Sequence, residues 1–190
     1  MNQIEVQLED SLNRVNFIFK NEEIITECIS EYNGFTILGE LFGPFERGKK
    51  YRLAYFIALP FIENNILKID SREKCDNTDV QRYAISERDD QSLIYRENKF
   101  FLNKVKEFRF LFEKEVIENK KPKLDLDRFS SYSINLIDNR LLKLLKLARA
   151  SLSLDDERKL TNSEKVLFSK LFELIKVWRD FFLVNKEKKL

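Results

Sequence analysis

Apolar residues recur along the second half of the chain at the three- and four-residue spacing of a helix that buries one face. This spacing predicts a long helix over residues 92–119, ended by Pro122, whose buried face is formed by Phe101, Val105, Phe108, Phe112 and Val116. A second block over residues 126–152 has a broad apolar side formed by Ile134, Ile137, Leu141, Leu144, Leu145, Ala148 and Leu152. Both blocks are expected to pack against other helices.

Local capping signals mark two further helices. Asp76 precedes a short polar helix that is expected to end near Asp90. Thr161 and Glu164 have the spacing of a capping box, in which each side chain accepts a bond from a free backbone amide at the start of the last helix. That helix carries an apolar stripe formed by Leu167, Leu171, Leu174, Ile175, Trp178 and Phe182.

Residues 53–69 form another helix candidate, in which apolar positions come first and polar positions later. Pro60 interrupts it, because proline lacks the amide hydrogen that would bond to the carbonyl of Phe56. We therefore expect a kinked helix here.

The first part of the chain has short runs rich in β-branched and aromatic residues. Residues 15–19, 24–29 and 35–41 are predicted strands, and Asn33-Gly34 is a hairpin signal between the last two. Residues 1–13 are either a short element or a frayed end. The strands would bury too little surface to be very stable alone and should lean on another part of the chain.

The four glycines all fall within residues 34–48, a segment that also contains Pro44. Glycine permits positive φ and proline fixes φ, so the backbone is expected to turn sharply here. We predict a joint between a small β-rich module, residues 1–51, and a helical bundle of about five helices, residues 52–190. The predicted fold class is α+β, mainly α.

Composition argues against most catalytic chemistry. The 190 residues include no histidine, which removes the commonest general base and the usual zinc ligand, and the two cysteines stand far apart in sequence. The glycines match no phosphate-binding pattern. We expect no enzyme activity, no cofactor and no metal. The longest apolar run is far shorter than a membrane span needs, and the N-terminal residues do not resemble a signal peptide, so we expect a soluble intracellular protein.

Charge is unevenly distributed although the net charge is only +2. Residues 1–52 carry six Lys and Arg against nine Asp and Glu, and residues 53–190 carry 28 against 23. Three acidic clusters, at 125–127, 89–90 and 155–157, are interpreted as helix caps or solvated turns in preference to metal sites.

A basic row is formed by Arg140, Lys143, Lys146 and Arg149. Their three-residue spacing describes a slanted ridge on a helix, which could face phosphates or another partner. It could equally be the solvated side of a helix whose other side is leucine, and this interpretation is favoured because no aromatic residues are interleaved for base stacking.

Aromatic residues on two helices face in too many directions for a single core. A partner subunit would explain large apolar groups on two faces of one helix, and a tightly wrapped core is the alternative. The candidate subunit-interface residues are Phe101, Phe108, Phe110, Phe112, Trp178, Phe181 and Phe182.

The glycine-rich segment resembles one class of subunit of the GINS DNA replication complex, the class in which a small B domain precedes a helical A domain. Such subunits carry a segment like LxGxLGPFxxGxxxxxPLWLAxxL, and this chain has LGELFGPFERG followed at matching distance by AYFIAL. The matching residues are Leu38, Gly39, Leu41, Gly43, Pro44, Phe45, Gly48, Phe56 and Ala58. Ala54 and Phe56 replace the proline and tryptophan of the pattern, and Pro60 falls inside the expected first helix.

The resemblance implies a non-catalytic scaffold subunit that joins the MCM helicase and a RecJ-like partner at the replication fork. An archaeal subunit of this type would pair with an A-then-B subunit in a 2:2 heterotetramer, with further contacts to primase and polymerase, in the cytoplasm at the nucleoid. An autonomous helical DNA-binding protein, suggested by the basic row, is the alternative. A histidine-free enzyme that uses carboxylates and a metal is the third hypothesis.

Overall fold

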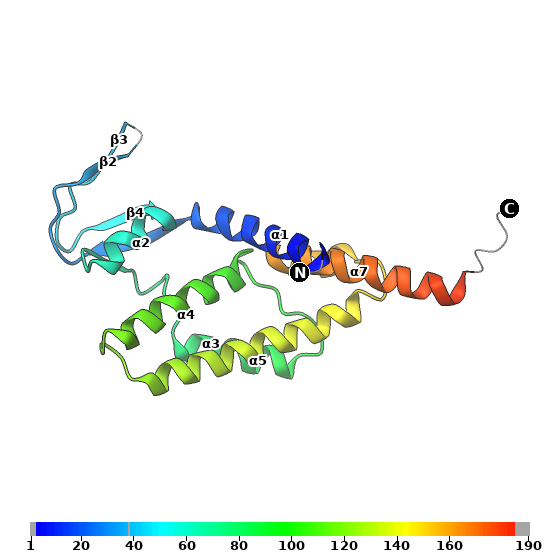
Figure 1. Ribbon diagram of the computed structural model, residues 1–190. Coiled ribbons are helices and arrows are strands. Elements are labelled where there is room, and N and C mark those ends of the chain that lie inside the picture. Colours follow the sequence, from blue (N-terminus) through cyan, green and yellow to red (C-terminus); the bar gives the residue numbers. More distant parts are fainter. Residues whose placement is uncertain (1–2, 38, 185–190) are drawn as a thin grey trace. The chain divides into compact units, whose positions relative to one another are not determined.

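The computed structural model describes residues 3–37 and 39–184, and the fold is α+β and mainly α, with 61% of residues in helices (Figure 1). This confirms the predicted fold class. Two compact units are present: residues 16–74, called the sheet unit below, and the described parts of residues 1–15 and 75–190, called the helical unit.

The sheet unit is built around β1 (Glu23–Cys28), which lies between β4 (Lys50–Ala54) and β5 (Leu67–Ile69) in an antiparallel sheet. Thr26 is the centre of the register, opposite Tyr51 on one side and Ile69 on the other. The helix α2 (Tyr55–Glu63) follows β4 directly. A separate hairpin is formed by β2 (Phe35–Ile37) and β3 (Glu40–Phe42).

The predicted strand at residues 15–19 is wrong, because these residues lie in the long helix α1 (Gln3–Lys20). β-branched and aromatic residues favoured a strand locally. These residues are helical because they continue a longer apolar pattern. From residue 4 to residue 19, apolar positions recur at three- and four-residue spacing along one helix face, formed by Ile4, Leu8, Leu12, Val15 and Phe19.

Two further predictions in the sheet unit, one of a hairpin turn and one of a helix, also fail. Asn33-Gly34 does not join two paired strands, because β1 pairs with β4 and β5 while β2 pairs with β3. The helix expected over residues 53–69 is only α2, which is followed by β5. Asn65 has a φ of 56° in the turn that separates them. The three-residue strand β5 is short, and its alternation of buried, exposed and buried positions gives too little pattern to identify it in sequence.

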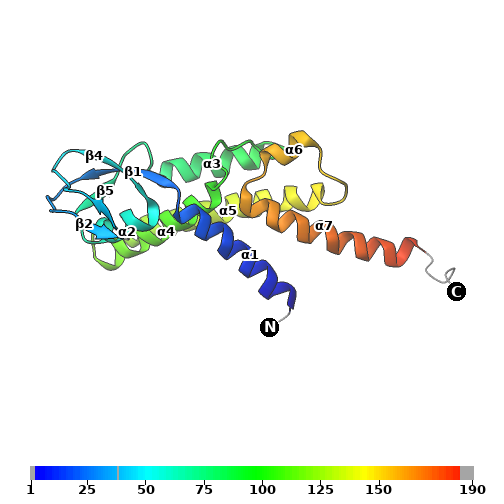
Figure 2. The same cartoon turned by 90° about the horizontal axis from the view of Figure 1, so that it is seen from above.

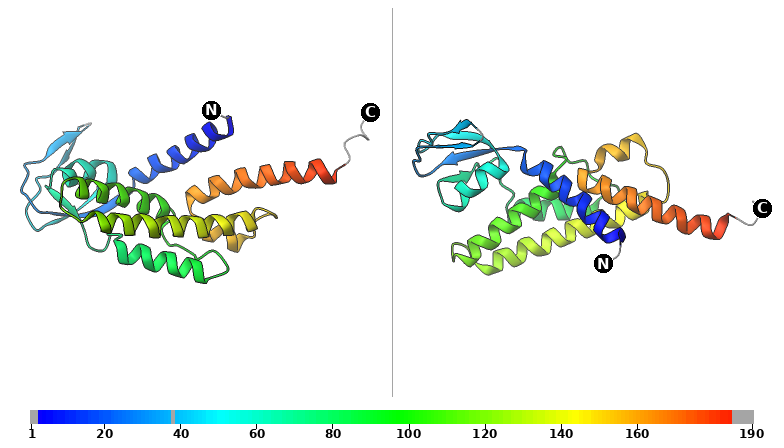
Figure 3. Two further views of the ribbon diagram at one scale, coloured as in Figure 1. Left: turned by 60° about the horizontal axis from the view of Figure 1, so that its bottom comes forward. Right: turned by 45° about the horizontal axis from the view of Figure 1, so that its top comes forward.

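The helical unit contains α3 (Asn77–Asp89), α4 (Phe101–Ile117), α5 (Lys123–Leu147), α6 (Leu154–Lys159) and α7 (Asn162–Leu183). The helices α3 and α4 pack against α5, which also contacts α7 (Figure 2). One apolar cluster joins α3, α4 and α5, and a second joins the C-terminal end of α5 to the first half of α7. The second half of α7 extends beyond the end of α5 in every view (Figure 3).

The predicted helix starts at Asp76 and Thr161 are confirmed. Asp76 and Asp79 form a reciprocal capping box at α3, and Thr161 and Glu164 form one at α7. The helix predicted from residue 92 starts only at residue 101, and residues 92–100 form an irregular loop that ends in a turn at residues 99 and 100.

The buried face of α5 differs from the predicted one. Ile134, Ile137 and Leu145 are exposed. The buried positions are instead Phe129, Ser133, Leu136, Arg140, Lys143 and Leu144. Two basic residues and a serine therefore occupy positions that the prediction reserved for apolar side chains.

The predicted domain boundary between residues 51 and 52 falls inside β4. Each neighbour of this boundary is held in the strand by pairing with β1, where Tyr51 lies opposite Thr26 and Arg52 opposite Ile25. The compact units divide instead after residues 15 and 74. The glycine-rich segment consequently lies wholly within the sheet unit.

Candidate functional site

The second half of α7 carries an apolar surface that nothing in the described chain covers. Trp178 is 66% exposed, Phe181 78% and Phe182 64%. The three rings touch one another, since Phe182 has its ring centre 5.0 Å from that of Trp178 and 5.0 Å from that of Phe181. Leu174 and Val177 are exposed on the same side of the helix. We call these five residues the α7 apolar face.

The first half of α7 uses a different side for the core. Phe168 is buried, and Leu171, Phe172 and Ile175 pack around it against the end of α5. At about 100° of rotation per residue, the α7 apolar face is turned by roughly a quarter of a circle from this packed side. The helix thus presents two apolar surfaces, one filled by its own unit and one open.

The candidate interface residues on α4 behave differently. Phe101 and Phe112 are buried in the cluster shared with α3 and α5, and Phe108 packs against the same cluster. These three residues stabilise the helical unit, and the buried Phe101 and Phe112 are not available to a partner, whereas Phe108 is half-buried. Phe110, at 42% exposure, is the most exposed of the four α4 candidates.

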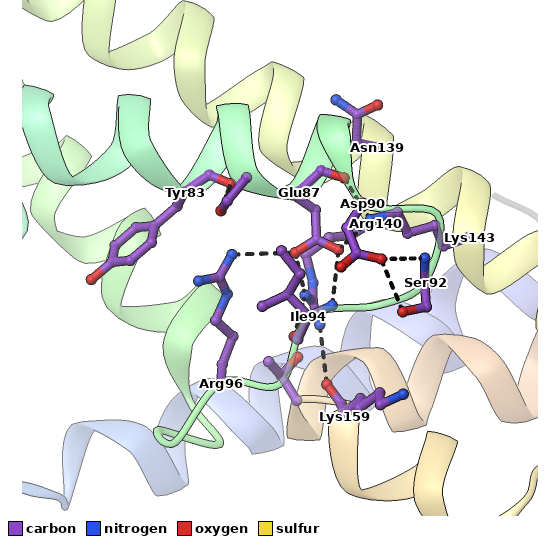
Figure 4. Close-up of polar contacts among 12 residues, drawn as sticks. Tyr83, Glu87, Asp90, Ser92, Ile94, Arg96, Asn139, Arg140, Lys143 and Lys159 are labelled. Carbon is purple, nitrogen blue, oxygen red and sulfur yellow. Dashed lines mark hydrogen bonds and ion pairs between the residues drawn. The ribbon is translucent and has the colours of Figure 1, made fainter.

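The basic row is divided in the same way. Lys146 and Arg149 are exposed, whereas Arg140 is 1% exposed and Lys143 8%. The expectation of an exposed ridge is therefore wrong for Arg140 and Lys143. Neither can meet a phosphate on a surface, and both instead bind carboxylates inside the helical unit (Figure 4).

Arg140 lies at the centre of a buried ion cluster that joins α3, α5 and α7. Its guanidinium makes a two-point contact with Glu164, through Nε to Oε1 at 2.6 Å and Nη2 to Oε2 at 2.8 Å. Nη1 donates to Oε2 of Glu87 at 2.8 Å and to the carbonyl of Ile94 at 3.1 Å, and Nη2 donates to the carbonyl of Lys159 at 3.2 Å. These contacts use the full donor capacity of the guanidinium.

Glu87 receives bonds from three cations. Lys143 donates to Oε1 at 2.8 Å and to the backbone carbonyl of Glu87, while Arg96 reaches Oε2 at 3.2 Å. The guanidinium of Arg96 also lies over the rings of Tyr83 and Phe101, at 4.8 and 5.1 Å from their centres. Figure 4 shows these side chains converging from the end of α3, from α5 and from the loop before α4.

Burial and ion pairing act in opposite directions on these groups. Burial favours the neutral form of Glu87, but the bonds from Lys143 and Arg140 outweigh it and hold the pKa of Glu87 below its ordinary value. Burial likewise opposes the charge of Arg140, yet Glu164 and Glu87 raise the pKa of Arg140. For Arg96 burial dominates and lowers the pKa.

Glu164 performs two roles that the sequence suggested only in part. Its Oε2 accepts from the backbone amide of Thr161 at 2.8 Å, as a capping box requires, and also from the Thr161 hydroxyl at 2.9 Å. The same carboxylate pairs with Arg140 from α5. The ion cluster therefore fixes the start of α7 against the rest of the helical unit.

The involvement of Glu87 and Arg96 was not identified from sequence. The available signal is the position of Arg140 and Lys143 on α5, since Phe129, Ser133, Leu136, Arg140 and Leu144 follow one helix face at spacings of four, three, four and four. A cation inside such a stripe must be paired when buried. Which carboxylate pairs with it depends on contacts between residues more than 20 positions apart.

The glycine-rich motif folds as an internal corner of the sheet unit. Gly43 has a φ of +101°, and a Cβ atom there would lie 2.7 Å from the Cα of Gly34. Phe45 is buried among Tyr32, Tyr51 and Phe61.

The remaining motif residues do not gather in one place, and they differ in burial. Ala58 is buried, while Leu41 and Phe56 are exposed. Gly39 and Gly48 have positive φ but open space around them, and Pro44 is exposed after a cis peptide bond. Leu38 lies outside the described residues.

The acidic clusters have no catalytic arrangement in the described part of the chain, where no group of three or more metal-binding side chains gathers. Asp90 binds the amide and hydroxyl of Ser92, and Asp125 and Asp155 lie in the first turns of α5 and α6. Among the described helices, none combines the length and apolar character needed to cross a membrane.

No protein-family model matches the chain, and the comparison with curated proteins gives no match. The α7 apolar face, together with the exposed Phe110, is therefore the candidate site on structural grounds alone.

Proposed function

We propose that this protein is a non-catalytic scaffold subunit of the GINS complex, of the archaeal type with the B domain first. The glycine-rich segment and the order of a small β-containing part before a helical part support this proposal. The single observation that carries the scaffold role is the α7 apolar face, because an exposed cluster of three contacting rings is typical of a surface that another subunit covers.

The size of this surface fits a subunit contact. Aromatic side chains bury about 150–250 Å² each, so the exposed parts of Trp178, Phe181 and Phe182 amount to roughly 400 Å². At about 25 cal/mol per Å², covering them contributes on the order of 10 kcal/mol before the costs of association. Those costs are estimated at about 4–15 kcal/mol, so neighbouring residues must contribute to a stable complex.

In this role the chain would pair with an A-then-B GINS subunit in a 2:2 heterotetramer. The assembly would connect MCM helicase with a RecJ-like protein in the cytoplasm, at replication forks on the nucleoid, and contact primase and polymerase. The helical unit would supply subunit contacts, and no bond chemistry would be assigned to this chain.

The alternative, an autonomous DNA-binding protein, loses most of its support because Arg140 and Lys143 are enclosed in the ion cluster. Lys146 and Arg149 remain exposed. Two cations give a shallow salt dependence, since each phosphate contact contributes a slope of about 0.9.

Sedimentation velocity of the chain alone, and mixed with an A-then-B subunit from the same source, tests the proposal. We expect a complex of the mass of two copies of each chain, and we expect Phe181→Glu to weaken it. Leu154→Glu is the matched control, because Leu154 has the same exposure, 78%, and lies on α6. A chain that stays a monomer and ignores the A-then-B subunit refutes the proposal.

A further inference from the structure

We propose that the α7 apolar face of one copy of this chain binds the helix α1 of a second copy, in an antiparallel helix pair that forms twice about a two-fold axis. This inference deepens the proposed function and rests on it in treating the face as a subunit interface. It names the segment that covers the face, which is the N-terminal half of α1.

The apolar side of α1 is packed at one end and open at the other. Val15 and Phe19, toward the C-terminal end, are buried. Leu8 and Leu12 are half-buried, and Ile4 is 42% exposed. The helix α7 is divided in a similar way, since its first half packs in the core and its second half carries the exposed face. Each helix therefore has an apolar end that the described chain leaves partly exposed.

The apolar positions of the two helices match when one helix is reversed. Along α1 they are separated by four, four, three and four residues, in the order Ile4, Leu8, Leu12, Val15 and Phe19. Read backwards along α7, the same intervals separate Phe182, Trp178, Leu174, Leu171 and Leu167. At about 100° per residue, each set lies within about 40° of its second member. An antiparallel pair with Leu8 level with Trp178 therefore brings all five positions into register.

This register joins the exposed ends of the two helices. Ile4 comes level with Phe182, and Leu12 comes level with Leu174, so the open part of α1 lies on the α7 apolar face. A shift of one turn in one direction would set Leu12 opposite Lys170. A shift in the other direction would place Ile4 beyond the end of α7.

The copy that supplies α1 is a second one. Residues 3–15 of α1 belong to the same compact unit as α7. Trp178 and Phe181 nevertheless stay 66% and 78% exposed, so the chain's own α1 does not cover the face in this structure. A second copy brings an identical helix, and two-fold symmetry lets each copy give its α1 and receive the α1 of the other.

One edge of the proposed pair joins a cation to a carboxylate. Arg179 lies about 100° around α7 from Trp178, and Glu9 lies about 100° around α1 from Leu8 in the same sense. Edges of the same sense face each other when two helices pair antiparallel. Glu9 then lies two residue levels, about 3 Å along the axis, from Arg179. Both side chains are exposed and can meet across this edge.

The other edge also joins opposite charges. Glu173 and Arg14 lie on the other edge of α7 and of α1, one residue level apart in this register. Glu173 lies 3.8 Å from Lys170, so in the pair it would sit between two cations. In a parallel pair the edges would exchange, which would set Arg14 toward Arg179 and Glu9 toward Glu173. Charge therefore selects the antiparallel direction.

The charges on the two edges of α7 also disfavour other occupants of the face. A second α7 in an antiparallel pair would set the edge of Arg179 against its own copy, and likewise the edge of Glu173. A surface of phosphates, as in nucleic acid or an anionic membrane, would meet the carboxylates of Glu173 and Asp180 as well as Arg179. The helix α1 offers an opposite charge to both edges.

Sedimentation equilibrium of the full chain without other subunits tests self-association. Trp178 reports on the face directly, because it is the single tryptophan of the chain. We expect a dimer dissociation constant of about 10–100 μM, as suits two short helix contacts, and acrylamide quenching of Trp178 that falls as the dimer forms. A chain that is still monomeric at about 1 mM, roughly ten times the upper expected constant, overturns the inference.

Leu8→Glu tests α1 as the covering helix. It should weaken the dimer at least tenfold and restore the quenching of Trp178. Val6→Glu is the matched control and should change neither, because Val6 is 36% exposed and lies about 160° around α1 from Leu8. A dimer that Leu8→Glu leaves unchanged overturns the inference. Shielding of Trp178 in the monomer that Leu8→Glu removes also overturns it, because the chain's own α1 would then be the occupant.

Two charge reversals at exposed positions test the direction and the partner. Glu9→Arg alone and Arg179→Glu alone should each weaken self-association about tenfold, because each replaces two attractions by two repulsions. An equimolar mixture of the two variants should form dimers tighter than those of either variant alone, because in the mixed pair both contacts at this edge join opposite charges. A mixture no tighter than the separate variants overturns the antiparallel pairing of α1 with α7.

These results are separable from failure of the proposed function. If the A-then-B subunit binds the chain but the chain alone never self-associates, the α1 inference fails and the scaffold proposal survives. If α1 and α7 pair but no A-then-B subunit binds, the scaffold proposal fails alone. Circular dichroism of every variant checks that helix content is unchanged.

Discussion

Replacing Arg140 by methionine should destabilise the helical unit strongly. The guanidinium is 1% exposed and donates to Glu164, Glu87 and two backbone carbonyls. Methionine fills a similar length of the cavity but donates nothing, so Glu164 keeps only its bonds from Thr161. Glu87 keeps Lys143 and Arg96.

The expected loss of stability follows from the carboxylates that stay buried without Arg140. Removing one partner of a buried ion pair costs about 3–5 kcal/mol, because the remaining charge is buried without compensation. For a chain of this size each kcal/mol lost from the free energy of unfolding lowers the melting temperature by about 2–4 °C, so we expect a decrease of about 10 °C. This cost is a large fraction of a typical domain stability of about 5–15 kcal/mol.

Urea and thermal unfolding followed by far-ultraviolet circular dichroism measure the effect, because most of the helix lies in the helical unit. The control is Arg128→Met, whose side chain is 59% exposed and lies 3.9 Å from Asp125, and which should cost less than about 1 kcal/mol. Adding Glu164→Gln to Arg140→Met should recover part of the loss, since it removes an unpaired charge. A loss no greater than that of Arg128→Met would refute the assignment of Arg140 as the central cation.

Three further predictions concern single groups. Gly43→Val should destabilise the sheet unit by about 2–4 kcal/mol in urea unfolding, because φ at Gly43 is +101° and the new Cβ atom would meet the backbone of Gly34. The control is Gly48→Ala, which should cost only about 1 kcal/mol, because Gly48 has positive φ but open space around it. The bond from Lys50, together with bonds from the loop that follows, holds the pKa of Asp70 well below its ordinary value. The ionised form therefore stabilises the fold above the ordinary carboxyl range, and this stability is lost as the pH falls below about 4, a dependence that Asp70→Asn should flatten in acid unfolding curves. Burial raises the pKa of Cys75 to about 12, so mass spectrometry should find it unmodified by iodoacetamide at pH 8 in the folded protein and modified in urea; fast labelling of the folded state would contradict its burial.

The elements that sequence predicts well are those whose signals are local. The capping boxes at Asp76 and Thr161 depend on residues three positions apart, and both helix starts are confirmed. The strand β1 is predicted because its run of β-branched residues agrees with its later pairing. Residues 15–19 fail because the same local preference conflicts with an apolar stripe that extends over the whole of α1.

The candidate site is predicted less well, because burial depends on distant contacts. Phe101 and Phe181 are indistinguishable as aromatic residues on amphipathic helices, yet the first packs against Tyr83 and the second is exposed. Arg140 was assigned to the surface because it begins a basic row at three-residue spacing on a helix whose other side is rich in leucine. Its burial requires Glu87 and Glu164, which lie 53 and 24 residues away along the chain.

The division of α7 into two halves separates stability from association. The first half is held by the contact between Arg140 and Glu164 and by the packing of Phe168, so its loss would unfold the region. The second half exposes Phe181 and its neighbours, whose replacement removes no internal contact with the core. A change at Phe181 should therefore weaken association with another subunit without lowering the melting temperature of the chain, whereas Arg140→Met should lower both the affinity and the melting temperature. The ion cluster thus fixes the direction in which α7 leaves the helical unit, because the same carboxylate that caps the helix also anchors it to α5.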